Sequence, residues 1–79
     1  MKLEQAKKEI ITYREKHLAR VTREKATFTK WYDRGAQYVF DGGTTNEAMN
    51  KLAPWGCSPT IANGVLAGAL QATRLLSAD

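Results

Sequence analysis

Residues 3–34 read LEQAKKEIITYREKHLARVTREKATFTKWYDR and contain neither proline nor glycine. Apolar side chains recur through this stretch with helical spacing, and on a helical wheel they fall within a stripe about 100° wide. The pattern predicts one long amphipathic helix over residues 3–34. The stripe consists of Leu3, Ala6, Ile10, Tyr13, His17, Val21, Phe28, Trp31 and Tyr32.

The middle of this predicted helix is its weak point, because three threonines between Thr22 and Thr29 lower the helix propensity. A kink or a break there is left open. An unbroken helix of this length would extend roughly 45 Å, which exceeds the diameter of a compact domain of 79 residues. The rest of the chain could not cover the whole stripe, so we expect its far end to face a second copy or another partner.

Turn and capping residues organise the second half of the chain. Gly35 is the predicted stop of the long helix, and residues 35–44 are predicted to form a crossover that is extended or a brief strand. Thr44 and Glu47 have the spacing of a capping box, which starts a short helix that ends at Pro54. Ser58 followed by Pro59 predicts the start of a last helix that runs to about residue 77.

These elements predict an all-α fold of one domain, residues 1–79. It comprises a long basic helix (3–34), a crossover (35–44) and a C-terminal helical hairpin (45–77). The aromatic side chains at the junction of these parts are expected to form core, with an exposed Trp31 or Trp55 indicating a binding hot spot instead. This aromatic cluster comprises Phe28, Trp31, Tyr32, Tyr38, Phe40 and Trp55.

A chain of 79 residues buries a limited core, so another source of stability is expected. The single Cys57 excludes an internal disulfide, and one Cys with one His is too few for a structural zinc site. We therefore expect no metal and no cofactor, and predict a homodimer. Two glycines four residues apart in the last helix allow a close helix contact, or are merely tolerated small residues. The residues predicted for dimer or helix packing are Ile10, His17, Val21, Gly64 and Gly68.

The positive charge lies in the N-terminal half. The chain has a net charge of +4, and counting residues gives +5 for residues 1–34 (ten basic, five acidic) and −1 for residues 35–79 (two basic, three acidic). This segment is the candidate surface for an acidic partner, with an ordinary solvated face of mixed charge as the alternative. The candidate partner-binding residues are Arg14, Arg20, Arg23, Lys30, Trp31 and Arg34.

The sequence offers no recognisable catalytic arrangement, since neither His17 nor Cys57 has an identifiable catalytic companion. We expect both side chains to have packing roles and the protein not to be an enzyme. The N-terminus lacks the apolar run of a secretory signal, and the last helix contains polar residues that disfavour a membrane span. A cytoplasmic location is expected.

Residues 45–65 resemble a helix-turn-helix in having a capped short helix, a turn with Gly56 and a second helix capped by Ser58. The second helix departs from that motif, because it has no Lys or Arg before Arg74 to contact bases or phosphates. We therefore expect a small non-enzymatic regulator or inhibitor that binds a macromolecule, in the first place a protein. Small inhibitors encoded by phages fit this profile by analogy. The alternative is a DNA-binding transcriptional regulator, so nucleic acid stays open as a partner.

Overall fold

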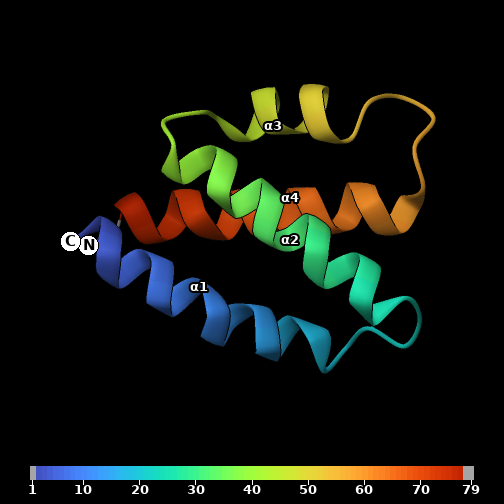
Figure 1. Ribbon diagram of the computed structural model, residues 1–79, viewed down its shortest axis with the longest axis horizontal. Coiled ribbons are helices and arrows are strands. Elements are labelled where there is room, and N and C mark those ends of the chain that lie inside the picture. Colours follow the sequence, from blue (N-terminus) through green and yellow to red (C-terminus); the bar gives the residue numbers. More distant parts are fainter. Residues whose placement is uncertain (1, 78–79) are drawn as a thin grey trace.

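The computed structural model describes residues 2–77, which form four α-helices and no strand. Figure 1 shows α2 crossing over α4, with α1 along one side of this pair and α3 along the other. The all-helical prediction is confirmed. The helices are α1 (Leu3–Leu18), α2 (Lys25–Phe40), α3 (Thr45–Leu52) and α4 (Pro59–Ser77).

The predicted long helix over residues 3–34 is wrong, because the chain turns back between α1 and α2. The turn comprises residues 19–24 and overlaps the weak stretch at Thr22, and Glu24 adopts the left-handed conformation with φ 53°. Folding back buries Ile10 of α1 and Phe28 of α2 in the same core, which is favourable because it removes apolar surface from water. Much of the apolar stripe is thus covered within the chain. Its length no longer argues for a second copy.

Gly35 does not end a helix, and the predicted crossover over residues 35–44 is also wrong. Helix α2 continues through Gly35 to Phe40, and the connection to α3 comprises only residues 41–44. A Cβ atom at position 35 would lie 2.5 Å from the carbonyl oxygen of Val65. Glycine is required here because the backbone of α4 approaches closely, not because the helix terminates.

The glycines of α4 complete this close contact from the other side. A Cβ atom on Gly64 would lie 3.0 Å from the carbonyl oxygen of Phe28, and one on Gly68 would overlap the carbonyl oxygen of Tyr32. The close helix approach that the glycine spacing predicts therefore occurs between α4 and α2 of one chain. Around this contact lie the buried residues of the core: Ala6, Ile10, Phe28, Tyr32, Ala36, Val39, Phe40, Ala48, Val65, Ala69, Ala72 and Leu75.

The predicted caps of α3 and α4 are confirmed. The Thr44 hydroxyl accepts a hydrogen bond from the Glu47 backbone N–H, and the Glu47 carboxylate accepts one from the Thr44 backbone N–H, each at 3.2 Å. The Ser58 Oγ atom accepts from the Thr60 N–H at 3.3 Å, and Pro59 is the first residue of α4. In Figure 1, α3 runs back along α4 in the opposite direction. The two helices thus form a hairpin joined by residues 53–58.

An ion pair between Arg14 and Asp33 holds α1 against α2. The Arg14 Nη1 atom donates to both carboxylate oxygens of Asp33, at 2.7 and 2.8 Å. These hydrogen bonds are the main reason that the pKa of Arg14 is raised above its ordinary value. The pair thus links α1 to α2 outside the buried core.

We expect Asp33→Asn to destabilise the fold by about 1 kcal/mol, because Asp33 is half-exposed and a partly solvated ion pair contributes no more than this. Urea unfolding followed by circular dichroism measures the loss. Glu15→Gln is the matched control, since the Glu15 carboxylate lies 3.4 Å from Arg14 at the edge of the same cluster. Equal stability of the two variants would show that the Asp33 pair does not hold α1.

No helix among residues 2–77 combines the length and the apolar character needed to cross a bilayer.

Candidate functional site

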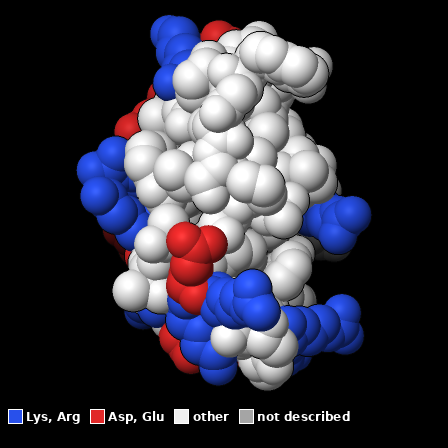
Figure 2. All heavy atoms as spheres, turned by 90° about the vertical axis from the view of Figure 1, so that its right-hand side faces the viewer, with Lys and Arg blue, Asp and Glu red and all other residues white. Residues whose placement is uncertain are grey.

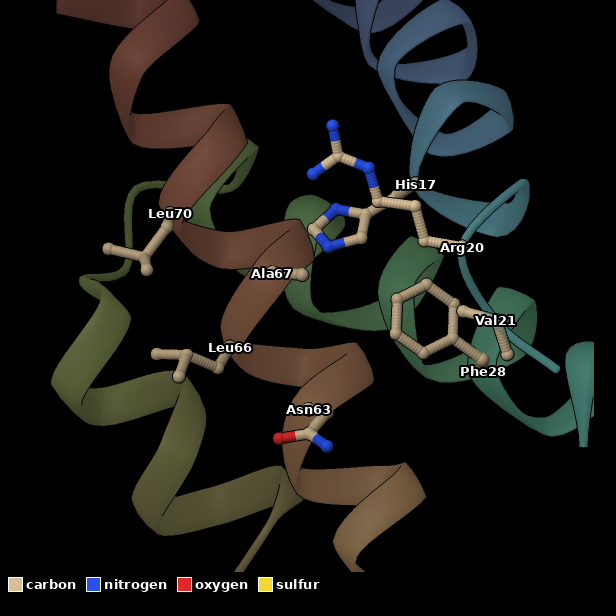
Figure 3. Close-up of a pocket in the computed structure, with 8 residues that line it drawn as sticks. All are labelled: His17, Arg20, Val21, Phe28, Asn63, Leu66, Ala67 and Leu70. Atoms are coloured by element: carbon tan, nitrogen blue, oxygen red, sulfur yellow. The ribbon is translucent and has the colours of Figure 1, made fainter. Parts of the chain in front are cut away.

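A hollow of about 420 Å³ lies between the end of α1 and the outer side of α4. In Figure 3, His17 and Val21 lie on one side of it and α4 forms the other, with Ala67 directed toward His17. Phe28 forms part of its floor and is 4% exposed, so the hollow reaches down to the core. The residues that line it are His17, Arg20, Val21, Phe28, Asn63, Leu66, Ala67 and Leu70.

The last turn of α1 places His17 over the aromatic core. Its ring centroid lies 5.6 Å from that of Phe28 and 6.1 Å from that of Tyr32, with an edge-on arrangement toward Tyr32. The imidazole is nevertheless exposed, since one side of it faces the hollow. His17 thus extends the aromatic core to the molecular surface, where it offers an amphipathic wall to a ligand.

Leu66 and Leu70 form the apolar rim of the hollow. Each is 39% exposed, and the two lie one turn apart on α4, outside the face that packs on α2. In Figure 3 both side chains project from α4 on the side away from His17. An exposed pair of leucines beside a hollow that reaches the core is the kind of surface that a partner protein covers.

Two smaller hollows adjoin the first, of about 160 and 260 Å³. One is lined by Tyr13, Lys16, His17, Arg20 and Gln71, and the other by Val21, Thr22, Arg23, Phe28, Thr60 and Asn63. The three share lining residues, and we refer to them together as the α1–α4 groove. From Thr60 to Gln71 the groove follows about three turns of α4, roughly 17 Å.

The charged side chains that line the α1–α4 groove are all basic. They are Lys16, Arg20 and Arg23, whereas the part of α4 that lines the groove carries no charge. Lys16 Nζ lies 5.3 Å from the centre of the Tyr13 ring, which keeps this cation close to an exposed aromatic surface. Figure 2 shows Lys and Arg gathered in the lower part of the view, with Asp or Glu among them, beside a broad uncharged face.

One acidic side chain reaches the end of the groove. The carboxylate of Glu24 accepts a hydrogen bond from the Thr60 hydroxyl at 2.5 Å, which ties the α1–α2 connection to the start of α4. Glu24 is not among the residues that line the groove. The groove is therefore basic along the end of α1 and the α1–α2 connection, and uncharged along α4.

The structure separates the predicted partner-binding residues into three places. Arg14 is paired with Asp33, whereas Arg20 and Arg23 line the groove. Lys30, Trp31 and Arg34 lie together on α2 outside the groove, with Lys30 Nζ 5.7 Å and Arg34 Cζ 4.7 Å from the centre of the Trp31 ring. Trp31 is partly buried beneath these two cations.

The residues predicted for dimer or helix packing also divide. Ile10, Gly64 and Gly68 are buried within the chain, so they are not available to a second copy. His17 and Val21 line the groove and stay accessible. Trp55, which was expected in the core, is fully exposed in the connection between α3 and α4. This connection turns at Gly56, whose φ of 90° favours glycine.

Sequence reasoning missed Leu66 and Leu70, although the two leucines are four residues apart and so lie on the same side of the predicted last helix. It also did not include Lys16 among the candidate partner-binding residues. Only the return of α1 along α4 brings Lys16 beside Gln71.

The side chains that line the groove offer cations, one imidazole and apolar surface, but no thiol or carboxylate. Across residues 2–77, no three His, Cys, Asp or Glu side chains come together as metal ligands. Cys57, on the α3–α4 connection, does not line this groove.

Comparisons with models of protein families, with curated proteins and with solved structures find no match to this chain.

Proposed function

We propose that this protein is a small non-enzymatic regulator that binds another protein through the α1–α4 groove. The observation that carries the proposal is the exposed pair Leu66 and Leu70 beside a hollow whose floor is the buried Phe28. Exposed apolar side chains next to a pocket allow a partner to insert a side chain and exclude water around it. The proposal rests on this surface and not on the length of the N-terminal helix.

The same surface is less suited to duplex DNA. In a helix-turn-helix, the second helix presents donors to base edges, whereas the exposed side of α4 presents Asn63, Leu66, Ala67 and Leu70. Arg74 is the first basic residue of α4 and follows these side chains by one turn. Titration with duplex DNA at two salt concentrations tests this alternative, and steep salt dependence would favour it.

Capture of partners from the native host tests the proposed function when it is done with paired variants. We expect the wild-type protein and the Ile11→Ser variant to capture the same polypeptide. The double variant Leu66→Ser with Leu70→Ser should bind that polypeptide at least tenfold more weakly, which corresponds to about 1.4 kcal/mol. Ile11 is the matched control because it is 50% exposed and lies outside the groove. The retained polypeptide is identified by mass spectrometry.

Equal capture by all three proteins would reject the groove as the binding surface. Light scattering on the same samples decides whether a second copy is the occupant. A dimer that the two serine substitutions dissociate would assign the groove to self-association, as the predicted homodimer requires, and would overturn the proposal of a different protein partner. Circular dichroism checks that the variants are folded.

A further inference from the structure

We infer that the α1–α4 groove receives an acidic amphipathic helix, about three turns long, from the partner protein. This inference rests on the proposed function and adds the chemistry of the bound segment. It follows from the shape of the groove and from the separation of charge and apolar surface across it.

The shape of the groove fits a helix. It lies between the end of α1 and the outer side of α4, and its apolar rim consists of Leu66 and Leu70, one turn apart on α4. Side chains spaced three or four residues apart on a bound helix interdigitate with such a ridge. One of them would enter the hollow above Phe28 and lie between His17 and Ala67.

The basic side chains of the groove favour a bound helix with negative charge. Lys16 lies in the last turn of α1, and Arg20 and Arg23 continue the row of cations in the α1–α2 connection. Carboxylates on one side of a bound helix would face this row while its apolar side faces α4. A basic helix would be repelled by this row, because the one acidic side chain at the groove, Glu24, lies at its end, where it accepts the hydrogen bond from Thr60.

A second copy of the chain, a nucleic acid or a membrane would each match fewer features of the groove than an acidic helix does. A second copy would bring a net charge of +4 toward another +4, and its own basic row toward the same groove. A nucleic acid backbone would use the cations but leave Leu66 and Leu70 unused. An anionic membrane surface would use the cations and the exposed Leu66 and Leu70, but would leave the hollow above Phe28 unfilled.

Two synthetic peptides with the same leucine stripe test the inference, one carrying Glu and the other Lys on the remaining positions. Binding to the ¹⁵N-labelled protein is followed by NMR at about 50 mM and about 300 mM salt. We expect the acidic peptide to bind at least tenfold more tightly at low salt, with shifts at Asn63 and Ala67. We expect raised salt to weaken its binding.

A matched pair of charge variants locates the effect. Lys16→Glu with Arg20→Glu should reverse the peptide preference, whereas Lys7→Glu with Lys8→Glu, which changes the net charge equally but outside the groove, should retain it. The same shift of preference in both variants would overturn the inference, because it would report overall charge alone. Circular dichroism again verifies folding.

The failures of the two proposals are distinguishable. Equal binding of both peptides, lost in Leu66→Ser with Leu70→Ser, would reject the acidic helix and leave the groove as a protein-binding surface. Tighter binding to vesicles of anionic phospholipid than to the acidic peptide would reject a protein helix as the occupant. Absence of binding by either peptide would also reject the inference, while the capture experiment decides separately on the proposed function.

Discussion

Gly68→Ala is expected to destabilise the protein by about 3 kcal/mol or more, because the added methyl group overlaps the carbonyl oxygen of Tyr32. The obstacle is the backbone of α2, which has no rotamer to escape into. Alanine gains about 1 kcal/mol of helix propensity over glycine, and this gain is too small to offset the overlap. A domain of 79 residues has a total stability of about 4–12 kcal/mol, so a large part of it would be lost.

Urea unfolding followed by circular dichroism measures the effect, and Gly64→Ala is the internal comparison. A methyl group there would lie 3.0 Å from the carbonyl oxygen of Phe28, which a small backbone shift relieves, so the loss should be clearly smaller. If Gly68→Ala were as stable as the wild type, α2 and α4 could not approach as closely as described. The groove on the other side of α4 would then lose its support.

Tyr32 should make stability fall between about pH 10 and pH 12. Its side chain is fully buried with no hydrogen-bond partner for its hydroxyl, and burial is the main reason that its pKa rises from 10.0 to about 12. The unfolded chain therefore releases this proton first as the pH rises, which favours unfolding. The expected loss is about 2 kcal/mol by pH 12.

Comparison with Tyr32→Phe isolates this contribution, because every other ionisable group is present in both proteins. We expect the variant to be at least as stable as the wild type at pH 7, since it removes an unsatisfied buried hydroxyl, and to lose less stability above pH 10. Tyr38→Phe, at a partly exposed position, should follow the wild type. Parallel curves for wild type and Tyr32→Phe would show that this hydroxyl is not buried as described.

The starts of α3 and α4 were predicted correctly from the local sequence. The capping box of Thr44 and Glu47 and the Ser58–Pro59 start depend on interactions within a few residues, so the sequence pattern contains the full information. Gly35 was misinterpreted for the opposite reason. Glycine is needed at this position because the backbone of Val65, thirty residues away, lies against it. In the sequence, such a glycine cannot be told from one that ends a helix.

The turn at residues 19–24 was the decisive difference between the predicted and the observed fold. Helical periodicity continues across it, and the only local indication was a run of poor helix formers around Thr22. The turn is favoured because it allows Ala6 and Ile10 to be buried. This burial requires α4, so the stretch around the turn does not reveal it. The groove was unpredictable for the same reason, since α1 contributes to it only after the chain has turned back.

Each of the other three helices contacts α4, although α4 follows all of them along the chain. During synthesis on the ribosome, the nascent chain therefore lacks the element against which its apolar side chains pack until the last of these helices emerges. Completion of the native structure must wait for that moment. Before it, the half-made protein is exposed to chaperones and proteases.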